Sequence, residues 1–482
     1  MKQLKTILLG IAFVGLIGCS SDDNGTTPPP PPPTDQAPTI TLSAPSGGAA
    51  VMPGGTVTIT WTAMDDNQVV GVDLSYTDDN NATDTPIASD LEGTSFDWTT
   101  PDETLYGVTI KGVVTDDAAQ TGEDTTEDIF AVVAFSERGY VTAETCADCH
   151  PNADADERLR DGHRYKLNKV VDGTPPTYPN STVPNPPAGS TWDDVTYVIG
   201  GYGWKARFIG TDGYIITAGG NNQWNLATEE WVDYHKDELK PYDCGPCHMT
   251  GWQTLAENGG VNQDGLVGIE GTWEEPGVRC EECHGPGVDH VSQQVASEID
   301  LDLTSEACGK CHQRGGLTVQ PEASGGFIRH HEQYNEWLMS AHADNDVGCG
   351  SCHDAHIGVS YGNPGIIEEC EGCHGTPSNA HLVPIAECET CHLAQATKSA
   401  TKENEFVGDV KTHIFTINPG AVGKDAMFFT EAGTGKTRTN AFVTLDFVCY
   451  QCHKDPLTGE GGSASTRTLA ELSARATGIH GG

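Results

Sequence analysis

Cysteine and histidine recur along this chain in one fixed order: Cys, two residues, Cys and then His. Sixteen of the 17 cysteines fall in eight copies of this motif. The copies are Cys146/Cys149/His150, Cys244/Cys247/His248, Cys280/Cys283/His284, Cys308/Cys311/His312, Cys349/Cys352/His353, Cys370/Cys373/His374, Cys388/Cys391/His392 and Cys449/Cys452/His453. The spacing lets two thiols form thioethers with one porphyrin while the next imidazole binds its iron. It therefore predicts eight covalently bound c-type haems.

Two other uses of paired cysteines explain the motif less well. Zinc sites also contain Cys-x-x-Cys, but they do not require a histidine directly after each pair. Disulfides suit an exported protein, but they would leave the eight motif histidines unexplained.

Ten histidines lie outside the motifs and are candidates for the second, distal iron ligand. They are His163, His235, His290, His330, His331, His342, His356, His381, His413 and His480. His330 and His331 are adjacent and count as one position, which leaves nine positions for eight irons. Methionine is scarce, with six residues, so His/Met ligation is disfavoured. We predict haems that are mostly or wholly bis-histidine; these relay electrons, because no coordination site is left for a substrate.

Local geometry singles out three of these candidates. His331 and His342 flank a predicted helix over 332–341, and eleven helical residues return a side chain to within about 20° of the same face. These two histidines would then serve two successive haems. His356 lies too close to His353 to reach the opposite face of the same iron, so it should bind the iron of a neighbour.

Part of the motif region resembles a known superfamily. The stretch 336–342 followed by 349–356, and the stretch 280–290, are similar to the multihaem nitrite reductases, the hydroxylamine oxidoreductases and their octahaem relatives. The resemblance implies distal roles for His290, His342 and His356. The nitrite reductases carry Lys in place of one motif histidine, which none of the eight motifs here does, and no residue matches the cross-linking tyrosine of the oxidoreductases. The resemblance therefore implies the haem scaffold, and no catalytic residue is predicted.

The first 19 residues have the pattern of an export signal. Lys2 and Lys5 precede an apolar run over 7–17, which is too short to span a bilayer. The sequence Leu-Ile-Gly-Cys ending at Cys19 resembles the lipobox of bacterial lipoproteins, which implies that Cys19 is lipidated; the alternative is an ordinary cleaved signal. Residues 20–36 form a Pro-rich linker, with six consecutive prolines over 28–33 that favour polyproline II.

Residues 37–135 contain neither cysteine nor histidine and alternate with period two. One predicted strand has Val57, Ile59, Trp61 and Ala63 on one face and threonines on the other. The same alternation recurs over 70–76, with Val70, Val72, Leu74 and Tyr76 on one face. The segment predicts an all-β sandwich, and its Asp-rich turns resemble bacterial Ig-like domains. Paired aspartates could bind calcium, but solvated turns explain them more simply. We expect this domain to act in spacing or docking.

Residues 140–482 hold all the motifs and are predicted to be a cytochrome c domain of loops and short helices packed around eight haems. Between the first two motifs, 190–235 predicts a small β insertion of two or three strands.

The chain is strongly acidic, with 26 Lys and Arg against 69 Asp and Glu and a net charge of −43. This charge disfavours nucleic acid and anionic lipid surfaces as partners.

Together, the motifs, the distal histidines and the leader favour an electron carrier rather than an enzyme: a lipid-anchored octahaem cytochrome of the outer membrane, at the cell surface or facing the periplasm. Its partners would be redox proteins and extracellular metal or protein acceptors. Two alternatives stay open: an octahaem reductase or oxidase of a small nitrogen or sulfur compound, and a homo-oligomeric subunit of a cytochrome filament.

Overall fold

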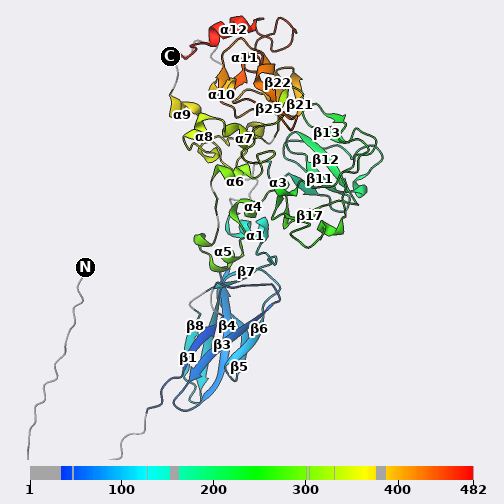
Figure 1. The fold of residues 1–482 in the computed structure, drawn as a ribbon. Coiled ribbons are helices and arrows are strands. Elements are labelled where there is room, and N and C mark those ends of the chain that lie inside the picture. Colours follow the sequence, from blue (N-terminus) through cyan, green and yellow to red (C-terminus); the bar gives the residue numbers. More distant parts are fainter. Residues whose placement is uncertain are drawn as a thin grey trace, which may run out of the picture.

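The computed structural model describes residues 34–45, 48–126, 129–151, 162–299, 301–302, 304–330, 332–375 and 387–480. The predicted signal peptide with Cys19, most of the Pro-rich linker, and the candidates His331 and His381 lie outside the described residues. Figure 1 shows an elongated molecule with a β-sandwich at one end and the motif helices at the other.

The N-terminal domain is a sandwich of two sheets, in agreement with the predicted all-β fold. One sheet has the order β1-β3-β6, and the other has the order β2-β9-β7-β4-β5 with β8 beside β7. All these pairs are antiparallel except β2 with β9. The strands are β1 Thr39–Ala44, β2 Ala50–Val51, β3 Thr56–Met64, β4 Val69–Asp78, β5 Asn81–Leu91, β6 Ser95–Thr99, β7 Leu105–Asp116, β8 Thr121–Thr125 and β9 Phe130–Val132.

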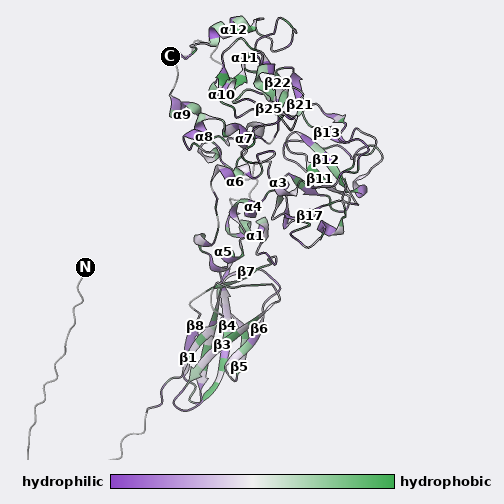
Figure 2. Ribbon diagram, viewed as in Figure 1, coloured by the Kyte–Doolittle hydropathy of each residue, from purple (hydrophilic) through white to green (hydrophobic). Residues whose placement is uncertain are grey.

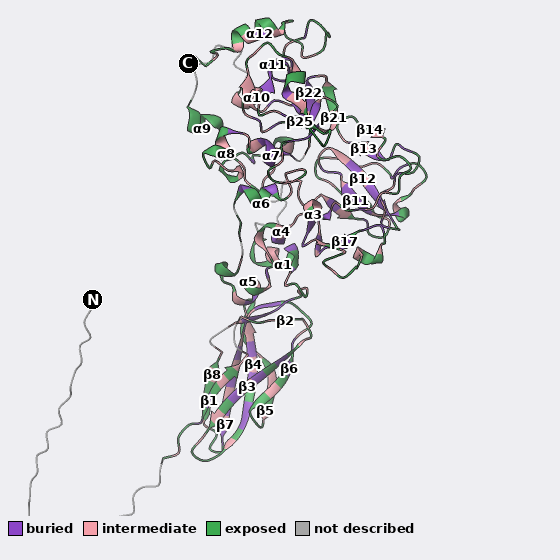
Figure 3. Cartoon of the chain, in the orientation of Figure 1, coloured by how far each residue is buried: buried purple, intermediate pink, exposed green. Residues whose placement is uncertain are grey.

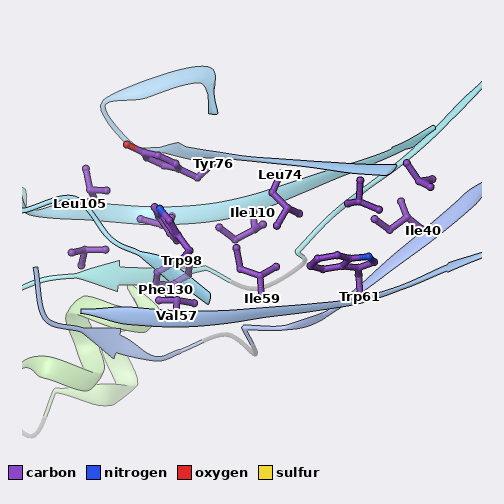
Figure 4. Packing of buried hydrophobic residues seen from close by; sticks show 14 residues of the cluster. Ile40, Val57, Ile59, Trp61, Leu74, Tyr76, Trp98, Leu105, Ile110 and Phe130 are labelled. Carbon is purple, nitrogen blue, oxygen red and sulfur yellow. The ribbon is translucent and has the colours of Figure 1, made fainter. Parts of the chain in front are cut away.

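The sandwich core lies between these two sheets (Figure 4). Val57, Ile59 and Trp61 of β3 are buried and alternate with exposed or half-buried residues, and Figure 2 shows mixed hydrophobic and hydrophilic residues along the strands. Val70 departs from the expected pattern because it is 53% exposed. The pairing of β4 with β7 shifts register between Val69 and Gly71, and such an irregularity turns one side chain away from the inner face.

A five-stranded sheet, separate from the sandwich, follows the first motif and has the order β10-β11-β12-β13-β14. It starts before the predicted insertion, because β10 pairs with β11 across about 30 intervening residues. Its two faces bury separate apolar clusters, one around Ile209 and one around Phe208. The strands are β10 Leu167–Lys169, β11 Val195–Gly200, β12 Lys205–Gly210, β13 Gln223–Asn225 and β14 Glu230–Val232.

The rest of the chain contains strands in addition to the loops and short helices that the sequence predicts. A four-stranded sheet has the order β19-β20-β21-β22, and the other strands pair in twos. These strands are β15 Met249–Thr250, β16 Gln253–Thr254, β17 Gly271–Thr272, β18 Glu275–Pro276, β19 Ala323–Ser324, β20 Phe327–Arg329, β21 Thr397–Asn404, β22 Val407–Val410, β23 Ile417–Asn418, β24 Phe428–Thr430, β25 Thr437–Thr439 and β26 Val443–Thr444.

The helices are short, as predicted, and most of them contain a motif. They are α1 Thr142–Cys149, α3 Gly245–His248, α4 Cys280–His284, α5 Val288–Gln293, α6 Ser305–Gly309, α7 Gln333–Trp337, α8 Ala341–Asp344, α9 Cys370–His374, α10 Cys388–His392, α11 Leu445–Cys449 and α12 Leu469–Ala476. The 3-10 turns are η1 Trp192–Asp194, η2 Gln263–Gly265, η3 Ala296–Glu298, η4 Cys349–Ser351, η5 Ser360–Gly362 and η6 Lys424–Met427.

The single helix predicted over 332–341 is wrong. The chain instead forms α7 and α8, and Ser340 between them is extended (φ −108°, ψ 158°) with its hydroxyl donating to the carbonyl of Trp337 at 2.6 Å. Serine favours this break because its side chain competes for backbone hydrogen bonds. His342 therefore lies in a new helix that begins at Ala341, so no continuous helix over 332–341 relates its side chain to that of His331.

Candidate haem-binding cavity

All eight motifs line one continuous cavity of about 3060 Å³. Both cysteines and the histidine of every motif border it, and all sixteen motif cysteines are free thiols rather than disulfides. Two of the motif helices bury little against protein: α9 and α10 contain no buried residue, and Figure 3 shows α9 as exposed. Helices of five residues are not stable alone, so the hollow they border is the place where macrocycles would supply the missing core.

Six motif histidines face a histidine from outside the motifs across this cavity. The pairs and their ring-centroid separations are His150–His290 at 6.3 Å, His312–His163 at 6.1 Å, His284–His356 at 6.2 Å, His374–His342 at 5.9 Å, His353–His413 at 6.1 Å and His392–His480 at 6.0 Å. An iron between two imidazoles would need two metal–nitrogen bonds of about 2 Å and two half-rings of about 1.1 Å, a total of about 6 Å. The rings are therefore spaced for one metal ion each, and the residues fit a haem.

Hydrogen bonds orient several of these rings through Nδ1. His290 Nδ1 lies 2.9 Å from the carbonyl oxygen of Val295, and His392 Nδ1 lies 2.7 Å from that of Phe415. A donor bond from Nδ1 to a carbonyl fixes the tautomer in which Nε2 is the metal-binding nitrogen.

Burial keeps several of the ligand candidates neutral. It lowers the pKa of His413 and His312 to about 4, with neighbouring histidines as a smaller cause. It lowers the pKa of His248 to about 3, helped by the positive charges of Lys166, Arg207 and Lys205. All three are therefore neutral imidazoles at pH 7, the form that binds metal.

The structure does not bring every candidate to the cavity. His235 lies outside the cavity lining with a side chain 43% exposed, and its Nδ1 is 2.7 Å from Glu238 Oε2. It is a surface residue of the loop after β14. His330 also lies outside the lining, but burial, helped by Lys205, Arg314 and Arg207, lowers its pKa to about 2.

Neighbouring motifs in space are not always neighbours in sequence. The thiol of Cys146 in the first motif meets Cys280 in the third, and Cys247 in the second meets Cys311 in the fourth. The fourth motif also lies near Cys283 of the third, and its Cys308 thiol meets the Cys349 thiol of the fifth. Further along, Cys352 lies near the sixth motif, Cys388 Sγ is 3.3 Å from Glu371 of the sixth, and α10 packs on α11.

Two half-buried cations lie near the second motif. Lys205 and Arg207 are alternate residues of β12; the Lys205 Nζ donates to the Ser399 carbonyl at 3.1 Å, and Arg207 bonds Gln223 Oε1 at 2.6 and 2.8 Å. Burial lowers the pKa of Lys205 to about 7. In the described part of the chain neither side chain has a carboxylate in an ion pair, so the His248 site is electropositive within an acidic protein.

Glu336 supports one histidine of the cavity, a role that no pattern in the sequence predicts. It is fully buried on α7, and its carboxylate accepts from Thr412 Oγ1 at 3.0 Å, from Thr397 Oγ1 at 3.2 Å and from the backbone N–H of His413. Burial raises its pKa to about 7. The sequence feature that could have indicated burial of this carboxylate is its position directly before the apolar residues Trp337 and Leu338.

Comparisons with known proteins agree with both halves of the chain. Residues 38–125 match the bacterial Ig domain family. The chain is 24% identical over 134 residues to the multiheme cytochrome MtrA of Shewanella baltica, a match that covers 24% of this chain and 35% of that protein, about a third of its length. A solved structure, the outer cell wall cytochrome OcwA, is similar with a TM-score of 0.44 and 18% identity over 70% of this chain and 86% of that one. Residues 38–125 thus match a bacterial Ig domain, and the motif-bearing remainder is similar to multihaem c-type cytochromes.

Proposed function

We propose that the chain conducts electrons through eight covalently attached haems with two histidine ligands each. The observation that carries this proposal is the set of six imidazole pairs spaced for one metal ion each across a single cavity. Each haem supplies a one-electron couple when bound. The motif cysteines would hold the macrocycle and two imidazoles would bind its iron, so that the iron would serve electron transfer alone.

Six proximal and distal pairs follow from the facing rings: His150 with His290, His284 with His356, His312 with His163, His353 with His413, His374 with His342, and His392 with His480. The distal ligands of the His248 and His453 haems then come from the remaining candidates, which are His330, His331 and His381.

The contacts between motifs support an order for the electron path. The first motif adjoins the third, the third adjoins the fourth, and the row continues through the fifth, sixth and seventh to the eighth. The second motif branches from the fourth, through Cys247 and Cys311. In Figure 1 this row runs from α1 and α4 beside the sandwich to α10 and α11 at the far end. Electrons would enter and leave at its ends and at the branch.

Haem number and ligation are tested together on the purified protein. Intact mass under denaturing conditions should exceed the polypeptide mass by eight haems, and the reduced spectrum should change little with carbon monoxide. Fewer than seven haems would overturn the assignment. Strong carbon monoxide binding at one haem would favour the octahaem reductase alternative, and a distal histidine supplied by a second copy would favour the filament.

We also propose a lipid anchor at Cys19 in the outer membrane, with redox proteins or extracellular acceptors as partners. The name of the similar outer cell wall cytochrome refers to a cell-surface location, and the lipobox pattern supports an anchor. Among the described residues, each helix falls short of the length and apolar character that a membrane span requires. Cys19→Ser should release the protein from membranes with its haem spectrum unchanged, whereas continued membrane association would contradict the anchor.

A further inference from the structure

The Ig domain packs directly on α5, the helix that carries His290. The Ser292 hydroxyl donates to the Gly48 carbonyl at 2.9 Å, and the Gln294 amide donates to Asp79 Oδ2 at 2.7 Å. Between these two bonds, Val291 packs against a buried cluster of Tyr106, Ala131 and Val133. All three of those residues belong to the Ig domain side of the interface.

The same domain also reaches the opposite side of this haem position. The Tyr106 hydroxyl donates to Asp148 Oδ2 at 3.1 Å, and Asp148 lies inside the first motif on α1. Burial and the Asp148 carboxylate raise the pKa of Tyr106, so the phenol stays protonated as the donor. Asp79 and Tyr106 themselves line the haem cavity. The Ig domain thus touches the element that holds His150 and the element that holds His290.

Outside the Ig domain, α5 is held at its N-terminus, where the Gly287 N–H donates to Glu281 Oε1 at 2.8 Å and the Val288 N–H donates to the Gly139 carbonyl at 3.1 Å. It contains six residues, its N-cap Gly287 offers no side-chain cap, and Gln294 at its C-cap is left-handed with φ 53°. A helix this short is unstable without tertiary contacts. The Ig domain contributes two hydrogen bonds and an apolar contact to it, through a cluster that is distinct from the sandwich core.

We propose that the Ig domain is a structural part of the first haem site. It positions α5 so that the His290 imidazole stays opposite His150, and it forms the wall at this end of the cavity. This inference rests on the proposed bis-histidine ligation. It gives the domain a role beyond spacing the haems from a membrane anchor: without the docked sandwich, His290 would leave the iron, and one haem would become five-coordinate.

The test places a charge in the interface from either side. Val291→Asp and Ala131→Asp each bury a carboxylate in the apolar contact, and each should produce carbon monoxide binding and a high-spin signal equal to one haem in eight, with all thioether attachments retained. Val70→Asp is the matched control, because Val70 is an exposed valine of the same domain outside this interface. It should leave every haem low-spin.

The variant His290→Ala distinguishes the positioning role of the Ig domain from the ligation of the first haem by His290. If His290→Ala gives one high-spin haem while both interface variants stay fully low-spin, the positioning role is wrong and the ligation stands. If His290→Ala itself leaves all haems low-spin, the assigned ligation of the first haem is wrong. If Ala131→Asp abolishes the β-sheet circular dichroism of the sandwich, Val291→Asp decides the question, because Val291 lies outside the sandwich.

Discussion

The centroids of facing imidazole rings are 5.9–6.3 Å apart, the separation that suits one metal ion between them. Each gap joins a motif histidine, whose place is fixed by two adjacent cysteines, to a histidine from another part of the chain. Counting residue types identifies the members of these pairs, because cysteine and histidine are scarce and their spacing is specific. The count cannot join them, because each pairing depends on how distant segments pack.

His235 shows why a count alone misleads. It satisfies every sequence criterion for a distal ligand, yet it lies at the surface with Glu238 as its partner. His235→Ala should therefore leave all haems low-spin, whereas His413→Ala should open one distal position and create one carbon monoxide-binding haem. Carbon monoxide difference spectra of the two variants check this. A high-spin haem in the His235 variant would contradict the surface assignment.

The charge of Lys205 should influence the potential of the nearest haem. A buried positive charge beside a haem favours the reduced iron, so it raises the midpoint potential. Because the pKa of Lys205 is lowered to about 7, raising the pH from 6 to 8 removes this charge, and the potential of the haem at His248 should fall. Lys205→Met should lower that potential at pH 6 and flatten its pH dependence. Spectroelectrochemical titration at the two pH values measures both effects.

The matched control for this experiment is Lys169→Met. Lys169 lies in the same sheet with a side chain 54% exposed and paired with Asp264. Its replacement should leave the potentials and their pH dependence unchanged. An equal shift in both variants would mean that overall charge, rather than the buried site, sets the potential.

Among the helices and strands, those that carry the proposed haem ligands are short and depend on contacts from other parts of the chain. Glu336 on α7 receives the backbone N–H of His413 and two threonine hydroxyls, and so connects α7 to β21 and to the strand-free segment after β22. The carboxylate therefore fixes the backbone at a proposed ligand without lining the cavity itself.

Glu336→Ala should loosen this connection. Three buried donors would lose their acceptor, at a cost of about 1–3 kcal/mol for each one left unsatisfied. We expect a lower midpoint of thermal unfolding together with partial high-spin character at one haem, measured by calorimetry and visible absorption. Glu336→Gln keeps an acceptor oxygen and should show smaller changes. If both variants resemble wild type, His413 is positioned by other contacts.

Sequence patterns predicted long elements better than short ones. The strand β3 was predicted with its inward residues Val57, Ile59 and Trp61, because nine residues of strict alternation leave one solution. The strands of β19–β22 were missed, since two- and three-residue strands show no period and β20 pairs with β21 across about 70 residues. The helix over 332–341 was wrong because periodicity ignores the hydroxyl of Ser340, which competes for backbone hydrogen bonds by donating to the Trp337 carbonyl.

At the scale of the whole molecule, the chain combines two kinds of core. The sandwich buries side chains such as Ile59 and Trp61 on its own, whereas the motif region surrounds a hollow. Composition predicts this division, because cysteine and histidine are absent from 37–135. The spatial order of the motifs was beyond the sequence, since the first motif meets the third and the second meets the fourth.

The sandwich should therefore fold without haem. Residues 34–135 expressed alone should give β-rich circular dichroism and one cooperative melt. In that fragment Ile59→Ala, at a fully buried site, should lower the free energy of unfolding by about 2–5 kcal/mol, while Val70→Ala at an exposed site should change it by less than about 0.5 kcal/mol. A non-cooperative melt would mean that the domain needs the cytochrome for stability.

The paired histidines have one more consequence, for the unfolded chain. His163 and His312 are about 150 residues apart, and one iron bound to both would close that loop as a cross-link does, restricting the disordered states available on denaturation by about 4–5 kcal/mol in the chain-entropy treatment of cross-links. Six such closures overlap along the chain. Each loop closure that forms lowers the entropy cost of the next closure, so maturation should be cooperative. A chain that lacks one cofactor loses a cross-link on which several segments depend. Limited proteolysis should then distinguish two populations: complete molecules that resist the protease and incomplete ones that are degraded.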